Sequence, residues 1–145
     1  MSEGITQSLY THYVQIFINA AVQAGKEILT IYEECGTDMQ IKGDGSPLTR
    51  AGLASHRMIT KKLSEIFPNI PIMSEEGKSV PYEVRRHWKE YFCIDPLDGT
   101  KEFIKRNGEF TINRAFIYSK KPVVGVVYVP VQETMHIGCS VIGSF

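Results

Sequence analysis

The order of helical and strand-like patterns along this chain limits its fold more than any other feature of the sequence. Apolar residues recur at helical spacing over Ile5–Cys35 and again over Thr49–Phe67, just before Pro68. Strands are expected at Met39–Lys42, Ile70–Met73, Tyr91–Ile94, Phe110–Tyr118, Val123–Val129 and Thr134–Val141, with a polar stretch at Lys78–Glu90, a short helix at Thr100–Lys105 and a turn at Lys120–Pro122. Helices followed by an antiparallel meander predict an α+β fold in which the helices pack on one face of the sheet.

The composition gives no sign of a boundary between two domains. Its 145 residues are 43% hydrophobic and 22% charged, which is typical of one globular domain with enough apolar side chains for a core. Because repeats and linker-like tracts are absent, residues 1–145 are expected to form a single domain. Lys plus Arg and Asp plus Glu both number 16, so no net field favours nucleic acid or an anionic membrane, and any phosphate must be bound by local contacts.

The N-terminal segment and the cysteines bear on location. The segment MSEGITQSLYTHY contains an acid and no continuous apolar run, which predicts neither a signal peptide nor a transmembrane segment. Three cysteines, Cys35, Cys93 and Cys139, are odd in number and widely spaced, which favours free thiols over a disulfide framework or a zinc site. We therefore expect a cytoplasmic protein, and leave open a peripheral association with the inner membrane.

Acidic residues follow two of the expected strands. Asp95 and Asp98 flank Pro96 and Leu97 directly after an apolar strand, and Glu75 follows the preceding strand, 20 residues (95 minus 75) earlier. Carboxylate and carbonyl oxygens are the ligands that Mg²⁺ prefers in proteins. These acids, together with the backbone carbonyl of Leu97, therefore predict a magnesium site.

A glycine and a threonine follow the second of these aspartates. Gly99 allows the backbone to approach a ligand closely, and Thr100 begins the expected short helix, whose free N–H groups suit an anion. Glu76 is assigned to orienting the acidic cluster, not to binding metal. An Asp-x-x-Asp turn by itself is usually explained by turn capping and solvation. Acids at two strand ends, joined to a Gly-Thr helix start, favour adjacent metal and phosphate sites.

Two strings of residues carry a family resemblance. Ser74-Glu75-Glu76 and the run from Ile94 to Asn113, IDPLDGTKEFIKRNGEFTIN, resemble the inositol monophosphatase superfamily. The longer run is most similar to its bacterial 3'(2'),5'-bisphosphate nucleotidase branch, and the resemblance extends from the first helix to about Gly138. It implies the layered α/β sandwich of that superfamily, with this chain as an N-terminal α+β portion that packs two long helices on a largely antiparallel sheet.

The resemblance also implies an activity and a cofactor. The reaction would be hydrolysis of the 3'-phosphate of 3'-phosphoadenosine 5'-phosphate to AMP and phosphate, in sulfate assimilation. The cofactor would be Mg²⁺, more than one ion, with lithium as an inhibitor, and the partner a small nucleotide bisphosphate. The implied residue roles are metal binding by Glu75, Asp95, the Leu97 carbonyl and Asp98, substrate binding by Glu75, Leu97, Asp98, Gly99 and Thr100, and catalysis by Thr100 and Glu75.

Two departures from the family pattern bear on turnover. Family members carry Pro-x-Thr-x-Ala-Asp before the second helix, whereas residues 47–52 of this chain end in Gly52. Because the family Asp would activate the attacking water together with Thr100, its loss predicts a fall of about 10²–10⁴-fold. The family's later Trp-Asp motif is not found, so the sequence is expected to be a truncated portion with an exposed sheet edge that invites a homodimer.

Three functions stay open at this point. The first is a bisphosphate nucleotidase, favoured by the string from Lys101 to Phe110. The second is an inositol-phosphate phosphatase. The third is a non-catalytic remnant that binds a cation or a partner, which Gly52 and the missing Trp-Asp motif favour.

Overall fold

The computed structural model describes residues 3–34 and 46–144 of the chain. Its elements in chain order are α1 (Glu3–Glu34), α2 (Pro47–Ile66), β1 (Ile72–Ser74), α3 (Tyr82–Arg85), β2 (Glu90–Asp98), α4 (Thr100–Lys105), β3 (Thr111–Tyr118), β4 (Lys121–Val129), β5 (Thr134–Cys139) and β6 (Gly143–Ser144). Both long helices and α4 confirm the sequence prediction. The strand expected at Met39–Lys42 lies outside the described residues.

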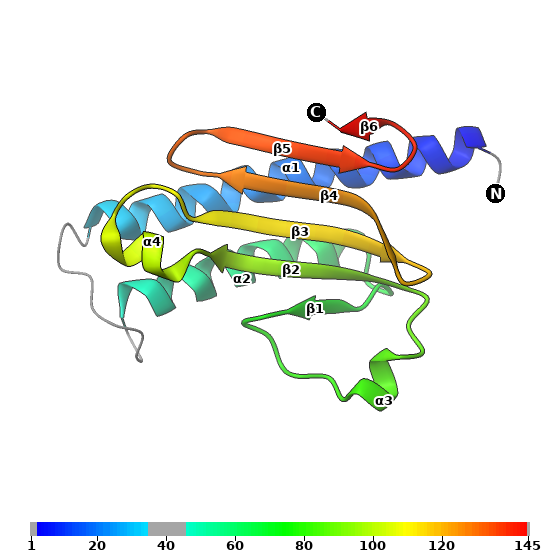
Figure 1. Cartoon of the computed structure of the whole chain (residues 1–145). Coiled ribbons are helices and arrows are strands. Elements are labelled where there is room, and N and C mark those ends of the chain that lie inside the picture. The colour runs from blue at the N-terminus through cyan, green and yellow to red at the C-terminus, as the bar shows by residue number, and fades with distance from the viewer. Residues whose placement is uncertain (1–2, 35–45, 145) are drawn as a thin grey trace.

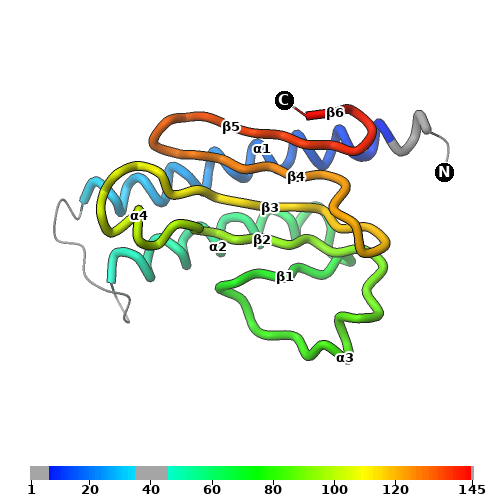
Figure 2. The backbone as a smooth tube through the Cα atoms, viewed as in Figure 1, coloured from blue at the N-terminus to red at the C-terminus, as the bar shows by residue number. Residues whose placement is uncertain are grey.

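The described strands form one sheet in the order β1-β2-β3-β4-β5-β6. Figure 2 follows the chain across this sheet, in sequence order from green to red. β1 and β2 are parallel because the segment containing α3 carries the chain back to the same end of the sheet, and each later pair is antiparallel. The meander and the α+β class are therefore confirmed.

Both long helices lie on one face of the sheet, as predicted (Figure 1). α1 packs on β3, β4 and β5, while α2 packs on α1 and β2. The helix α2 begins where Ser46 caps it, its hydroxyl accepting a hydrogen bond from the N–H of Thr49 at 3.1 Å, with Pro47 at the first helical position. Phe92 at the centre of the core is fully buried, with ring centroids 5.6 Å from Phe17 and 5.7 Å from Phe116. This aromatic cluster fixes α1 against the sheet.

The opposite face of the sheet is hollowed by a row of small residues. Cys93, Ala115, Gly125 and Gly138 are successive partners across β2, β3, β4 and β5. They line a shallow cavity of about 780 Å³ on that face. Because these positions alternate with the buried residues of the same strands, they point away from α1 and α2.

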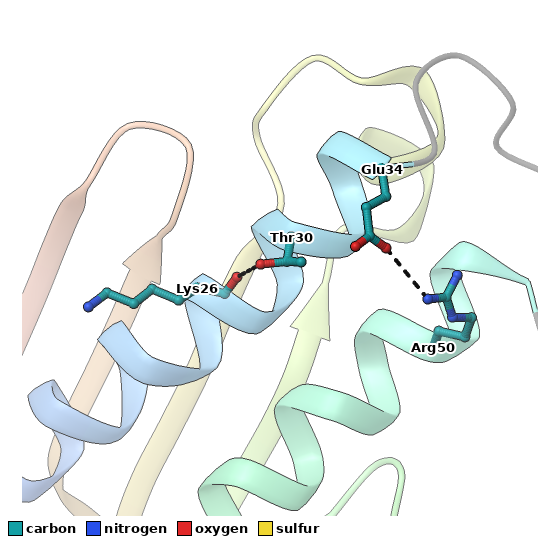
Figure 3. A network of polar contacts seen from close by, with 4 residues as sticks. All are labelled: Lys26, Thr30, Glu34 and Arg50. Atoms are coloured by element: carbon teal, nitrogen blue, oxygen red, sulfur yellow. Dashed lines mark hydrogen bonds and ion pairs between the residues drawn. The ribbon is translucent and has the colours of Figure 1, made fainter.

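A polar contact joins α1 and α2 near the ends of the helices. Figure 3 shows Arg50, in the first turn of α2, beside Glu34, the last residue of α1, with Nη2 and Oε2 3.8 Å apart. Nearby in α1, the Thr30 hydroxyl donates to the Lys26 carbonyl at 2.9 Å. The side chains of Arg50 and Glu34 are 50% and 60% exposed, so their attraction contributes little. Apolar packing, not this ion pair, determines how the two helices associate.

Several predicted boundaries are wrong. β1 lies two residues later at its start than expected, and β2 continues through Asp98 because pairing with β3 resumes beyond a bulge. The sequence pattern misses α3, since four residues are too few to show helical periodicity. The β3–β4 turn is Ser119-Lys120, both at positive φ, and β4 already includes Lys121 and Pro122. β5 ends at Cys139, and the following turn leads into β6.

Candidate metal and phosphate site

Parallel pairing brings the first two predicted acids together. β1 and β2 pair in register at Ser74 and Ile94, and the N–H of Glu75 donates to the Ile94 carbonyl at 3.4 Å. Because parallel strands end at the same edge of a sheet, Glu75 and Asp95 emerge as neighbours. Glu75 is exposed and Asp95 is half-buried. The expectation that Glu75 follows a strand end is confirmed.

A bulge sets the positions of the two aspartates. Pairing with β3 passes from Asp95–Asn113 to Asp98–Thr111, so one more residue lies on β2 than on β3 between these pairs. Pro96 has no N–H to donate to the ladder, which explains the interruption there. Asp95 and Asp98 therefore lie within the last residues of β2, and the prediction that they follow the strand is corrected.

Two hydrogen bonds hold the backbone between the aspartates. The N–H of Leu97 donates to Asp95 Oδ1 at 3.3 Å, and the buried Ser55 hydroxyl of α2 donates to the Pro96 carbonyl at 2.7 Å. The second bond spans 41 residues of sequence and joins α2 to the acidic turn. Sequence reasoning missed Ser55, because a serine within a helix gives no signal of a distant partner. The side chain of Leu97 is buried, which holds the turn on the core.

Glu75 and Asp98 both act on the ionisation of Asp95. Burial, a hydrogen bond with Glu75 and the negative charges of Glu75 and Asp98 raise the pKa of Asp95 from 3.8 to about 7, against the opposing effect of the Leu97 N–H. Carboxylates that repel one another in this way favour either a shared proton or a bound cation. The donor set consists of carboxylate oxygens, which fits a hard cation such as Mg²⁺.

The acidic side chains lie at neighbouring strand ends, but those of the described residues do not form a complete set of metal ligands. Within the described part of the chain, no three His, Cys, Asp or Glu side chains are arranged as ligands of one ion. The carboxylate of Asp98 instead accepts a hydrogen bond from Asn113 Nδ2 at 3.1 Å. Asn113 is a site residue that the sequence analysis did not single out, although it is the cross-strand partner of Asp95. This bond uses Oδ2 and leaves Asp98 Oδ1 for another partner.

Glycine is required where β2 meets α4. Gly99 has φ +87°, in the left-handed region, and a Cβ there would lie 3.2 Å from both the Phe110 Cα and Glu102 Oε2. Thr100 begins α4 and is exposed, and the N–H of Phe103 donates to the Gly99 carbonyl at 3.0 Å. The start of a short helix at Thr100 is therefore confirmed, whereas β2 continues to Asp98, just before Gly99. Phosphate binding by Gly99 and Thr100 stays a prediction.

Arg106 connects the end of α4 to Tyr32 of α1. Its Nη1 donates to the Tyr32 carbonyl at 2.6 Å, and its guanidinium lies 4.0 Å from the centroid of the Tyr32 ring. These contacts tie the end of α4 to α1 and occupy the guanidinium, so Arg106 has a structural role.

Gly52, which stands where the family pattern has an aspartate, lies close to Glu76. Gly52 is buried on α2, and a Cβ at this position would lie 3.3 Å from Glu76 Oε1. One helical turn later, His56 Nδ1 lies 2.8 Å from the Ser74 hydroxyl, and burial lowers the pKa of His56. The α2 position that lacks the expected acid is therefore adjacent to Glu76, next to the predicted ligand Glu75.

The fold and this arrangement define the class of protein. Helices layered on one face of a largely antiparallel sheet are the fold that the resemblance to the inositol monophosphatase superfamily implied. A family model described as "Inositol monophosphatase family" matches residues 10–145, and the chain belongs to this family.

Curated relatives are similar over most of the chain. It is 50% identical over 119 residues to the 3'(2'),5'-bisphosphate nucleotidase CysQ of Shigella flexneri, covering 80% of this chain and 47% of the relative. The CysQ of Escherichia coli K12 is 49% identical over 119 residues, with the same coverage. That of Haemophilus influenzae is 35% identical over 138 residues, covering 95% and 51%. The chain thus spans about half the length of the curated relatives it matches.

Solved structures agree with this assignment. The crystal structure of CysQ from Bacteroides thetaiotaomicron aligns with a TM-score of 0.83 and 44% identity, covering 92% of this chain and 48% of that one. An extragenic suppressor protein suhB from Bartonella henselae aligns with a TM-score of 0.75 at 24% identity, and supports the fold alone. In residues 3–34 and 46–144, no helix is long and apolar enough to cross a bilayer.

Proposed function

We propose that this chain provides the acidic metal-binding part of a magnesium-dependent phosphomonoesterase. Its substrate would be 3'-phosphoadenosine 5'-phosphate, converted to AMP and phosphate by loss of the 3'-phosphate. The observation that carries this proposal is the convergence of Glu75, Asp95 and Asp98 at the ends of β1 and β2. Support for the substrate comes from the relatives at 49% and 50% identity, which are named 3'(2'),5'-bisphosphate nucleotidases.

Each residue of the site has a distinct part in this proposal. The carboxylates of Glu75, Asp95 and Asp98 and the Leu97 carbonyl would hold Mg²⁺. When bound, Mg²⁺ neutralises phosphate charge and makes a bound water more acidic. Gly99 admits the phosphate close to the backbone, and Thr100, with Glu75, positions the attacking water. The proposal includes more than one ion and inhibition by lithium.

Gly52 sets the expected level of activity. A general base typically contributes about 10²–10⁴-fold, and Gly52 has no oxygen with which to act. An Asp introduced there would place its Cβ 3.3 Å from Glu76 Oε1, so Glu76 must shift to admit a second carboxylate. We therefore expect slow turnover by the unmodified chain. Gly52 also favours the alternative of a non-catalytic portion that binds a cation without hydrolysis.

Phosphate release separates these candidates. The purified chain is incubated with Mg²⁺ and either 3'-phosphoadenosine 5'-phosphate or an inositol monophosphate, beside Gly52→Asp, Gly52→Ala and Asp95→Asn. We expect lithium-sensitive release from the nucleotide, faster in Gly52→Asp than in Gly52→Ala and absent in Asp95→Asn. Faster release from the inositol phosphate would instead identify an inositol-phosphate phosphatase.

A binding measurement keeps the result interpretable. Calorimetric titration with Mg²⁺ reports whether the acidic site forms when no phosphate is released. Binding of Mg²⁺ that is lost in Asp95→Asn, without hydrolysis by any variant, would favour the non-catalytic candidate. Absence of Mg²⁺ binding would refute the proposed metal site itself.

A further inference from the structure

A second hollow lies at the other end of β2 from the acidic turn. We call it the α3 pocket, a cavity of about 240 Å³ whose lining includes Tyr82, Arg85, Arg86, Trp88, Tyr91 and Lys120. Tyr91 is four residues (95 minus 91) from Asp95 along the extended strand, a separation of about 13 Å, and Met73, which also lines the pocket, lies two residues before Glu75. Figure 1 shows α3 and α4 toward opposite ends of the sheet. The lining of the α3 pocket thus includes none of the proposed metal ligands, although Met73 brings it close to Glu75.

The α3 pocket is positively charged, although positive and negative side chains balance in the chain as a whole. Among the described residues, its lining contains the cations Arg85, Arg86 and Lys120 and no acidic side chain. Glu83 pairs with Arg86 at 3.3 Å, but these side chains are 77% and 49% exposed, so the pair is weak and a phosphate can displace it. The charge of the lining points to an anionic ligand.

Two of these cations have no carboxylate partner in the part of the chain that the structure describes. Within the described residues, Arg85 and Lys120 make no ion pair. Arg85 Nη1 lies 3.9 Å from Met73 Sδ, a weak acceptor that leaves the other guanidinium donors for a ligand. Lys120 is in the β3–β4 turn at φ 67°, and the Ser119 N–H donates to the Lys89 carbonyl at 2.8 Å, which holds this turn beside the start of β2.

Aromatic rings complete the lining. The ring centroids of Trp88 and Tyr91 are 5.7 Å apart and their planes are inclined by 50°, so the two rings do not stack face to face on each other. Tyr82 is 62% exposed, and the Arg85 guanidinium lies 5.4 Å from its ring centroid. Trp88 and Tyr91 are half-buried. Aromatic rings beside cations are the kind of surface on which nucleic-acid bases stack.

We propose that the α3 pocket binds a mononucleotide, with its base against Trp88 and its phosphate against Arg85 and Lys120. A planar ring joined to a phosphate is the ligand class that satisfies both the aromatic and the cationic lining. Binding here needs no Mg²⁺ and does not depend on the proposed hydrolysis.

Trp88 makes this proposal directly measurable, because it is the one tryptophan of the chain. The purified chain is titrated with AMP in excess EDTA while tryptophan fluorescence is recorded. We expect a saturable change, with adenosine and inorganic phosphate each binding at least about tenfold more weakly, because each lacks half of the contacts.

Matched variants assign the binding to this pocket. Arg85→Ala and Lys120→Asn should each weaken AMP binding by about tenfold or more, because each removes a charged donor. Asn tolerates the left-handed backbone of position 120, so this variant removes the charge without new strain. Lys105→Ala, which removes an exposed lysine of α4, should leave AMP binding unchanged.

Three results would overturn the proposal. One is the absence of AMP binding in EDTA, by fluorescence and by calorimetry. Another is binding that requires Mg²⁺ and is lost in Asp95→Asn, which would place AMP at the candidate metal site and support the proposed function instead. The last is a Trp88 emission change that follows protein concentration without AMP, which would assign the pocket to a contact between copies of the chain.

Discussion

The hydrogen bond from Ser55 to the Pro96 carbonyl predicts that α2 stabilises the acidic turn. Both residues are buried and the donor and acceptor are 2.7 Å apart, so Ser55→Ala leaves a carbonyl without its partner away from water. Such a loss costs about 1–3 kcal/mol of unfolding free energy. For a chain of this size the melting temperature should fall by about 2–4 °C for each kcal/mol.

Ser64→Ala is the matched control, since Ser64 lies exposed on the same helix. Alanine raises helix propensity equally at both positions, so the difference between the two variants isolates the buried hydrogen bond. Urea denaturation followed by circular dichroism gives both free energies, and an unchanged denaturant dependence confirms that the same surface unfolds.

The same substitution tests whether the turn matters for metal binding. Ser55→Ala frees the backbone between Asp95 and Asp98, so calorimetry should show weaker Mg²⁺ binding than in Ser64→Ala. If the two variants are equally stable and bind Mg²⁺ alike, strand pairing alone holds the turn and the reasoning is refuted.

Three further predictions concern the site and the sheet. The raised pKa of Asp95 means that the folded chain binds a proton more tightly than the unfolded chain, so stability from this group is present at low pH and lost as pH rises through about 7. Melting temperatures in EDTA should therefore fall between pH 5.5 and 8.5 more steeply for the unmodified chain than for Asp95→Asn, and equal slopes would contradict this. Gly99→Ala should lower the free energy of unfolding by about 1–2 kcal/mol for its left-handed backbone alone. Gly138→Ala, whose Cβ would meet nothing within 4 Å, should change it by no more than about 0.5 kcal/mol. Equal urea midpoints for the two variants would refute the argument. Among the described strands, β6 pairs with only two residues of β5, so the rest of the outer edge of β5 has no neighbouring strand. Sedimentation should therefore detect a concentration-dependent dimer, and Thr134→Lys on this edge should disrupt it. A monomer at every concentration would exclude edge pairing.

Much of the fold followed from local patterns. The apolar spacing that predicted the first helix matches a face that is buried in the structure, from Tyr13 through Phe17 to Ile28. The strands of the meander lie close to their expected ranges because alternation of buried and exposed residues is a property of each strand. Glu75 follows a strand as expected, but the sequence did not place Asp95 inside a bulged strand.

The missed features of the candidate sites depend on contacts between distant segments. Asn113 reaches Asp98 because β3 pairs with β2, and no local pattern of the sequence reports that pairing. The α3 pocket joins Trp88, next to β2, with Lys120 from a turn about 30 residues later. Periodicity describes one helix or strand at a time, so it gives no information on contacts between residues of different elements.

The sequence by itself determined the class of fold and the strand-end acids, because helix and strand periods and an Asp-Pro-x-Asp-Gly-Thr string are properties of neighbouring residues. Tertiary structure alone decided which partners those residues meet. Alternation along β3 directs Arg114 inward, but only the packing of α1 supplies the Phe17 carbonyl that accepts its Nη1 hydrogen bond, while burial lowers its pKa to about 9. Ser55 likewise gains its role from a carbonyl 41 residues away. Burial and hydrogen bonding are properties of the assembled core, and so they are fixed only when the chain has folded.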